Sequence, residues 1–319
     1  MSTITPMVQK VLITGIAGFI GSHTALAAKA LNWQVIGIDS ITDYYDIKIK
    51  RKNLEKLNAA GITDIHQTDL LDCDLESILR DVDAVLHCAA QPGVRDSWTH
   101  FDKYVASNIL ATQRLLEACA KSNVKRLVYS SSSSVYGDLQ EFPVLETNNL
   151  NPVSPYGITK LAAEHLCSSY SLNSDLSVVS LRYFTVYGPG QRPDMAIHRL
   201  INSALHQTPF PLFGDGSFIR DFTFVTDVAR ANLAALANDI PTGTIINIAG
   251  GESTSMSELI RMVEKITGKE VPLDRRPVQA GDVVRTGGDT TLAKKYLNWT
   301  PEVTLHQGLQ QQYESLNNS

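Results

Sequence analysis

Tyr156 and Lys160 have the residue types and the spacing for acid–base chemistry. They lie four residues apart, so on a helix both side chains share one face. A lysine ammonium beside a phenol stabilises the phenolate, which lets a tyrosine act as a base below its ordinary pKa of about 10. Many surface helices carry such a pair by chance. Here it gains weight from a glycine-rich turn near the N-terminus and from the serine run 130–134, which follows an apolar segment.

The glycine-rich turn has the form Gly-x-x-Gly-x-x-Gly and joins the apolar run 11–14 to a helical pattern over 19–31. We expect Gly15 to permit a tight turn, Gly18 to let the backbone approach a pyrophosphate, and Gly21 to allow close packing of helix on strand. The N-terminus of the helix, which begins with Phe19 and Ile20, then faces the anion with free N–H groups. The segment 14–21 therefore predicts a dinucleotide site.

Asp39 ends the next apolar run, Gln34–Ile38, roughly where a ribose-binding acidic residue is expected. Its carboxylate can accept hydrogen bonds from both ribose hydroxyls and would repel a 2′-phosphate. Ser40 and Ile41 supply no arginine to offset that repulsion. The sequence therefore predicts NAD rather than NADP.

Two further strand ends complete the predicted cofactor site. Asp69 and Leu70 follow the run 65–67, where an adenine edge would lie, although Asp69 also suits a plain turn. Ala89 and Ala90 follow the apolar strand Ala84–His87, and their small side chains would let the cofactor pass close.

The elements that must position these residues alternate between strand and helix over the first two-thirds of the chain. Besides those above, we expect helices over 44–57, over 101–122 (long and amphipathic) and from Pro155 onward, and strands over 126–129 and 176–181. Such alternation predicts parallel βαβ units and a Rossmann-type, doubly wound α/β sheet.

The pattern changes after about Gly188, where prolines and glycines cluster at 188–190 and 209–216. We expect shorter strands and irregular helices there. The prediction is an NAD-binding domain over residues 1–188 and a smaller α/β lobe over 189–319 that mainly binds substrate. A late strand near 244–248 would return to the first domain.

Composition excludes several other classes of protein. The chain has 319 residues, 43% of them hydrophobic and 19% charged, which fits a globular protein, and its net charge of -5 offers no basic surface for nucleic acid. No apolar run reaches membrane-spanning length, and residues 1–9 lack the features of a signal peptide. Scattered cysteines and histidines form no metal-binding or disulfide pattern, so we expect no metal and a reducing, cytoplasmic setting.

Together these motifs resemble the extended short-chain dehydrogenase/reductase family, specifically its nucleotide-sugar epimerases and dehydratases. The resemblance covers nearly the whole chain. Its matching segments are 14–21, 87–91, Asn108, 130–137, 156–160, 181–184 and 220–222.

The resemblance implies specific roles. Tyr156 would be the base, Lys160 would bind the nicotinamide ribose and lower the pKa of Tyr156, and Ser132 would hydrogen-bond the sugar hydroxyl. Gln91, Asn108 and Tyr183 would line the cofactor site, with Tyr183 near the nicotinamide. Arg220 would bind the UDP diphosphate, unless it only pairs with Asp221, and Asp282 would lie near the nucleotide ribose.

The residues after Ser132 distinguish between reactions. Sugar dehydratases typically carry Asp-Glu at the next two places, and UDP-glucuronate decarboxylases typically carry Glu at the second of them. This chain has Ser133 and Ser134, which offer no carboxylate. One base and one hydride acceptor remain, which predicts epimerisation at C4 of a UDP-sugar through a 4-keto intermediate.

Residues 184–188 and 192–195 resemble UDP-glucuronate 4-epimerases, as do 43–46 and 93–95, whereas galactose epimerases have Asn at the place of Thr185. A 4-keto uronic acid tends to lose CO₂, and a guanidinium can hold its carboxylate in two places. Arg192 is the first choice for this role, with Thr185, Ser133 and Ser134 as further donors and Arg95 as a weaker choice. A loop ion pair of Arg192 with Asp194 is the alternative.

Other functions stay open at this point. A UDP-glucose or UDP-N-acetylglucosamine 4-epimerase is the first alternative, and a UDP-glucuronate decarboxylase is the second. A non-catalytic NAD(H) sensor on the same fold usually lacks Tyr or Lys, whereas this chain has both. The resemblance also implies a homodimer formed through the helices at 101–122 and 155–170.

Overall fold

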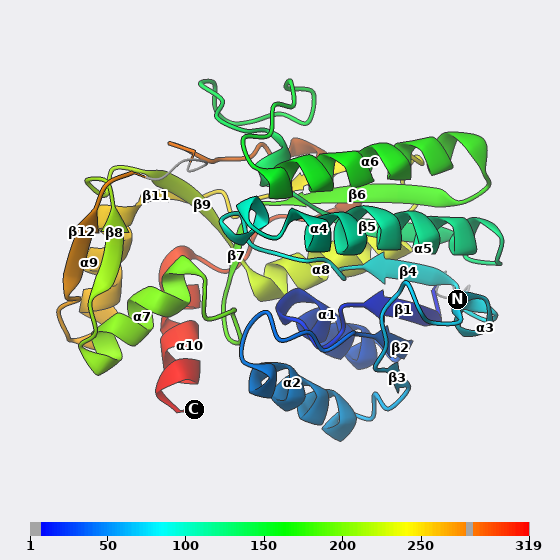
Figure 1. Cartoon of the computed structure of the whole chain (residues 1–319), viewed down its shortest axis with the longest axis horizontal. Coiled ribbons are helices and arrows are strands. Elements are labelled where there is room, and N and C mark those ends of the chain that lie inside the picture. The colour runs from blue at the N-terminus through cyan, green and yellow to red at the C-terminus, as the bar shows by residue number, and fades with distance from the viewer. Residues whose placement is uncertain (1–7, 279–282, 319) are drawn as a thin grey trace, which may run out of the picture.

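The computed structural model describes residues 8–278 and 283–318, and its largest element is a seven-stranded parallel sheet. The strand order is β3-β2-β1-β4-β5-β6-β10, and Figure 1 shows the strands from β3 to β6 side by side. The strands are β1 Lys10–Thr14, β2 Gln34–Ile38, β3 Ile65–His66, β4 Ala84–His87, β5 Arg126–Ser132, β6 Ser177–Tyr183 and β10 Ile245–Ile248. This order confirms the predicted doubly wound sheet. The direction of winding reverses between β1 and β4, where such sheets form a crevice at the carboxyl ends of their strands.

Helices cover both faces of this sheet, so most of the residues in its strands are buried. One face packs against α1 (Phe19–Ala30), α2 (Ile47–Ala59) and α8 (Val225–Ala237). The other packs against α3 (Leu75–Leu79), α5 (Ala111–Ala120) and α6 (Pro155–Asn173). The helix α6 thereby lies against β5 and β6, beside the serine-rich strand end (Figure 1).

Two predicted helices differ from those observed. The segment 101–122 is not one regular helix, because a π-helical turn, Val105–Leu110, separates α4 (Phe101–Tyr104) from α5. The second helix begins at Ile47 rather than at residue 44, because the Asp46 carboxylate caps it by accepting from the Lys48 N–H at 2.9 Å.

The remainder of the chain forms two small sheets and further helices, with a separate apolar core. One sheet has the order β11-β9-β7 (Ser253–Ser255, Ile219–Phe224, Thr185–Tyr187) and the other pairs β12 (Leu273–Arg276) with β8 (Phe210–Phe213). The helices are α7 (Ala196–His206), α9 (Met256–Thr267) and α10 (Leu305–Asn317). The expectation of irregular helices was wrong for α7, α9 and α10, since the prolines lie outside these helices and capping boxes start α9 and α10.

The domain boundary at residue 188 stays a prediction. Among the described residues, no helix has the length and apolar character needed to cross a membrane.

Candidate active site at the carboxyl ends of the parallel strands

The glycine-rich turn follows β1 and packs against α1 and the residues after β4. Gly15 has a φ of +69°, and a Cβ on it would lie 2.8 Å from the Ala89 nitrogen. A Cβ on Gly21 would overlap the carbonyl oxygen of Gly15. Both glycines are therefore required by the packing of the turn, and Gly18, Phe19 and Ile20 lead from it into α1.

Asp39 is buried directly after β2, and it forms an ion pair with Lys50 of α2. Its Oδ1 accepts from the Ile41 N–H at 2.8 Å and from Lys50 Nζ at 3.0 Å, while Oδ2 accepts from the Ala17 N–H at 3.0 Å. Sequence reasoning missed Lys50, although its place on the inner face of α2 beside buried Asn53 and Leu54 is a usable signal. Its ammonium offsets part of the negative charge of Asp39. Asp39 therefore repels a 2′-phosphate less strongly than the sequence alone predicts.

The other predicted cofactor residues also lie at this edge of the sheet. The Asp69 carboxylate accepts from the Leu71 N–H at 2.8 Å, which is the turn role, and Leu70 is buried. Asn108, on the π-helical turn, accepts from the Gln91 N–H at 2.7 Å and donates to the Gln91 carbonyl at 3.1 Å and to Thr159 at 3.0 Å. It therefore ties the segment after Ala89 and Ala90 to α6.

Tyr156 begins α6, and two serines fix that helix start. The Ser154 side chain accepts from the Gly157 N–H at 3.1 Å, and Ser97 accepts from the Tyr156 N–H at 3.1 Å. The Tyr156 ring meets the buried Tyr104 ring edge-on at 6.2 Å between centroids. Ser97 and Tyr104 carry no local sequence motif, which is why sequence reasoning missed them.

The pKa of Tyr156 reflects opposing causes. Burial raises it above the ordinary value, whereas a hydrogen bond with Ser132 and the charge of the Arg192 guanidinium lower it. The groups that lower this pKa here are Ser132 and Arg192. The expected effect of Lys160 on Tyr156 stays a prediction.

Lys160 lies one turn further along α6 and is buried. Its ammonium donates to the Ser130 carbonyl at 2.7 Å and lies 4.9 Å from the centre of the Tyr129 ring, and burial lowers its pKa to about 8. Tyr183, at the end of β6, shares a 3.0 Å hydrogen bond with the Ser130 hydroxyl and donates to Asn232 at 2.6 Å. The ends of β5 and β6 thus place Ser132 and Tyr183 side by side, in register.

Arg192 forms a fork with Asp194, the arrangement that the sequence left as an alternative. Its Nε donates to Asp194 Oδ1 at 3.0 Å and its Nη2 to Oδ2 at 2.9 Å. The Arg192 side chain is 19% exposed, and its charge acts on both Tyr156 and Tyr44. The ion pair and a place beside the candidate base therefore occur together.

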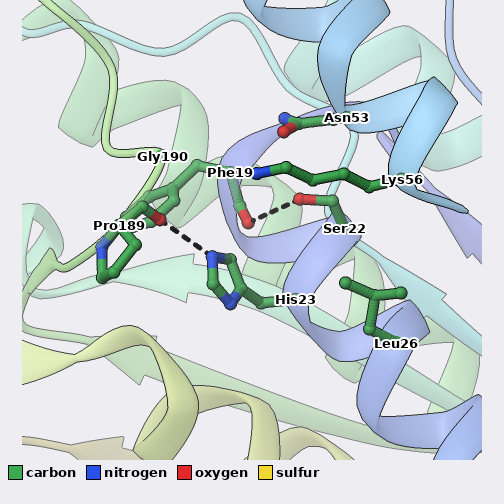
Figure 2. A pocket seen from close by; sticks show the side chains of 8 residues that line it. All are labelled: Phe19, Ser22, His23, Leu26, Asn53, Lys56, Pro189 and Gly190. Carbon is green, nitrogen blue, oxygen red and sulfur yellow. Dashed lines mark hydrogen bonds between the residues drawn. The ribbon is translucent and has the colours of Figure 1, made fainter. Parts of the chain in front are cut away.

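The loop that carries Arg192 is held firmly to both parts of the chain. In Figure 2, His23 of α1 meets the Pro189 carbonyl, at 2.8 Å, beside a small cavity of about 60 Å³ lined also by Lys56 of α2. Gln312 of α10 accepts from the Gly188 N–H at 2.9 Å. The buried Gln191 side chain donates to the Val186 carbonyl at 2.9 Å and accepts from the His198 N–H at 3.0 Å.

The remaining predicted substrate residues differ in their surroundings. The Arg95 guanidinium stacks on the Phe213 ring at 4.2 Å, across the two parts of the chain. Ser133 and Ser134 form a 3₁₀ turn after Ser132, and Thr185 begins β7.

Arg220 donates to the Ile219 carbonyl at 2.9 Å, while Asp221 accepts from the Gly250 N–H at 2.7 Å. Asp282 lies outside the described residues. Within residues 8–278 and 283–318, no group of three or more His, Cys, Asp or Glu side chains could hold a metal ion.

Residues 11–249 match the NAD dependent epimerase/dehydratase family. The chain belongs to this family. Its site therefore serves NAD, and the residues of the glycine-rich turn and Asp39 have the chemistry to hold a dinucleotide.

The relatives of this epimerase-family chain include proteins of two substrate classes. It is 42% identical to the UDP-glucuronic acid 4-epimerase of Bacillus cereus, solved with UDP-glucuronic acid and NAD, with a TM-score of 0.94 over 97% of this chain and 99% of that one. It is 38% identical to the UDP-glucuronate 4-epimerase of Thermodesulfobacterium geofontis, over 93% of each chain. It is 43% identical to an uncharacterised UDP-glucose epimerase of Bacillus subtilis, over 94% of this chain and 96% of that one.

Gly157 tests how closely α6 must approach the serine turn. A Cβ on Gly157 would lie 2.5 Å from the Ser134 carbonyl oxygen and 3.0 Å from Pro152 Cβ. Both neighbours are held by the backbone, so the Gly157→Ala variant must push α6 away and carry Tyr156 with it. We expect a fall in kcat of about 10²-fold, because displacements of this kind are that costly. Steady-state kinetics with circular dichroism checks this, and wild-type kcat in a folded variant would contradict it.

Ser132 tests the cause of the Tyr156 pKa. Its hydrogen bond favours the phenolate, so Ser132→Ala should raise the Tyr156 pKa. Because the base acts only when it is deprotonated, the acidic limb of the kcat/KM profile should move to higher pH. Ser168→Ala is the control, because Ser168 lies on the same helix about three turns further from Tyr156. An unmoved limb with lower activity would mean that Ser132 acts only on the substrate.

Proposed function

We propose that this protein is a UDP-glucuronate 4-epimerase, which interconverts UDP-glucuronate and UDP-galacturonate. The observation that carries the proposal is Arg192, whose guanidinium lies close enough to Tyr156 for its charge to lower the pKa of that phenol. A cation beside the base suits a sugar with a carboxylate next to the reacting carbon. The relatives from Bacillus cereus and Thermodesulfobacterium geofontis bear names consistent with it.

The proposed reaction uses Tyr156 to take the proton of the sugar 4-hydroxyl, with Ser132 hydrogen-bonded to that hydroxyl and to Tyr156. NAD, when bound, would accept the hydride from C4 and return it to the opposite face of the 4-keto sugar. Lys160 is buried one helical turn after Tyr156, and its ammonium is proposed to meet the nicotinamide ribose. The 4-keto sugar must present its other face before the proton returns from Tyr156, and no net oxidation results.

Epimerisation needs no second base. The carboxylate that lies next to the serine run, Glu164, is not free to act as one. Glu164 accepts a hydrogen bond from Ser131, but it is also bonded to Arg182 and is buried. A carboxylate held in that way is not available to expel water or to protonate C5. This supports an epimerase over a dehydratase or a decarboxylase.

The carboxylate of a 4-keto uronic acid must be kept out of alignment with the ketone. Arg192 is the proposed fork for it, and Thr185, Ser133 and Ser134 are the proposed further donors. Arg220 is proposed to hold the UDP diphosphate, and Arg95 stays a weaker candidate for the carboxylate. The nucleotide sugar would lie between residues 1–188 and the lobe 189–319.

The deciding experiment incubates the purified protein with UDP-glucuronate and follows the sugar by NMR. UDP-galacturonate formed without CO₂ supports the proposal. Conversion of UDP-glucose alone would overturn it in favour of a UDP-glucose 4-epimerase, the activity named for the Bacillus subtilis relative. A pentose product would point instead to a decarboxylase.

We also propose a cytoplasmic homodimer. Large apolar side chains are exposed along α4, the π-helical turn and α6, namely Phe101 (43%), Leu110 (52%), Ile158 (50%) and Leu172 (83%). Leu115 and Leu116, by contrast, are in the core. Light scattering at the mass of one chain would contradict the dimer, and recovery from the periplasm or medium would contradict the compartment.

A further inference from the structure

We infer that Asp194 is a positioning residue that orients the Arg192 guanidinium, and thereby determines whether the 4-keto uronate keeps its carboxylate. The inference rests on the proposed function and adds to it a residue that need not touch the substrate.

The ion pair fixes the plane of the guanidinium. Asp194 binds both Nε and Nη2, at 3.0 Å and 2.9 Å, so Arg192 cannot turn about its last torsion angles without breaking two charge-assisted bonds. A guanidinium has five N–H donors, and this fork uses one on each of these nitrogens. The edge formed by Nη1 and Nη2 then has donors left for a second carboxylate.

The loop that carries this ion pair is fixed by hydrogen bonds to its backbone. Pro189 is bonded to His23, Gly188 to Gln312, and the Met195 N–H donates to the Arg192 carbonyl at 3.1 Å. These contacts hold the backbone on both sides of the arginine. Asp194, which is 40% exposed, therefore restrains the one part of Arg192 that the backbone contacts leave to rotate, its side chain.

The charges of this ion pair act on the tyrosines at the candidate site, including the candidate base. Arg192 and Asp194 both act on the pKa of Tyr44 and of Tyr45, and Arg192 also acts on that of Tyr156. A carboxylate bound at the remaining Arg192 edge is thus near the candidate base. Asp194 occupies the edge of the guanidinium formed by Nε and Nη2. A substrate carboxylate can therefore bind only at the edge formed by Nη1 and Nη2.

The orientation matters because of the stereoelectronics of decarboxylation. In the 4-keto uronate, the C5–C6 bond breaks, its electron pair moves to the C4 ketone as an enolate, CO₂ leaves, and a solvent proton goes to C5. This step requires the C5–C6 bond to stand perpendicular to the plane of the ketone. A guanidinium with a fixed plane holds the carboxylate away from that angle, whereas a rotating one does not.

The test measures the ratio of CO₂ to UDP-galacturonate formed from UDP-glucuronate. Asp194→Asn keeps the size of the side chain and removes its charge, and Asp194→Ala removes both bonds. The control is Asp274→Asn, because Asp274 also pairs with an arginine two residues away, Arg276. There Nε and Nη2 both contact Oδ2 at 2.7 Å, and both side chains are exposed. Arg192→Lys reports directly on the guanidinium.

We expect the ratio to rise at least roughly tenfold in both Asp194 variants, as loss of charge-assisted bonds predicts, and to stay unchanged in the control. A ratio per turnover does not depend on how much enzyme is folded, so a merely structural role of Asp194 would not move it. If Arg192→Lys raises the ratio and the Asp194 variants do not, the inference is wrong. If Arg192→Lys leaves it unchanged, the inference is also wrong. Wild-type protein that does not convert UDP-glucuronate would contradict the proposed function instead.

Discussion

Replacing Tyr156 with Phe is expected to lower kcat by about 10²–10⁴-fold, the range over which a positioned acid–base group acts. The substitution removes only the hydroxyl, so the ring keeps its edge-on contact with Tyr104. The start of α6 depends on Ser154 and Ser97 through backbone N–H groups, which the variant retains. The loss should therefore fall on the chemical step, and the fold and NAD binding should persist.

Progress curves of sugar conversion, with NAD content measured in the same preparation, check this result. Tyr170→Phe is the matched control, because Tyr170 lies on the same helix and its hydroxyl accepts from Gln113 at 3.1 Å, far along α6 from the site. Conversion by the Tyr156→Phe variant at more than a tenth of the control rate would show that another group takes the proton.

The large sheet could be predicted because its strands are short apolar runs that end at glycine, aspartate, alanine or serine. Strands Gln34–Ile38 and Ala84–His87 were predicted at the bounds observed. The π-helical turn Val105–Leu110 could not be predicted, because its extra residue depends on Asn108 bonding Gln91 across the crevice. Similarly, the helices after residue 188 are amphipathic against a core that forms only when distant segments meet.

The site could be predicted where one segment carries its own chemistry, as the glycine-rich turn and the Tyr156–Lys160 pair do. Lys50 was missed because its partner, Asp39, lies on another element, eleven residues away. Ser97 was missed for the same reason, since its contact with Tyr156 spans 59 residues. The effect of Lys160 on the pKa of Tyr156 stays a prediction. The spacing places the two side chains on one helix face, but it does not determine that the ammonium bonds the Ser130 carbonyl.

The largest expected effect on stability comes from Arg182, at the centre of a buried network behind the serines. Its Nε and Nη2 bind the Glu164 carboxylate at 3.0 Å and 2.8 Å, and its Nη1 donates to the Tyr136 hydroxyl at 2.9 Å. Both charged side chains are about 1–2% exposed. Glu164 also accepts from Ser131, so the pair joins α6 to β5 immediately beside Ser132.

Arg182→Met should lower the free energy of unfolding by about 3–5 kcal/mol, because it leaves the Glu164 charge buried without a partner. Urea unfolding measures this loss. The double variant Arg182→Met with Glu164→Gln should recover part of it, since it removes the stranded charge. Lys121→Met breaks an exposed pair with Glu117 and should cost less than about 1 kcal/mol.

Unfolding of the single variant and of the double variant together shows whether the Arg182–Glu164 ion pair stabilises the fold or only fills space. A loss below 1 kcal/mol in Arg182→Met, or a double variant no more stable than the single one, would mean that Glu164 does not carry a buried charge. If the loss has the expected size, the same network must also keep Ser131, and with it Ser132, in register with α6. The folded fraction of Arg182→Met should then show a reduced kcat that the Lys121→Met control does not share, because the distance between Ser132 and Tyr156 depends on this contact between helix and strand.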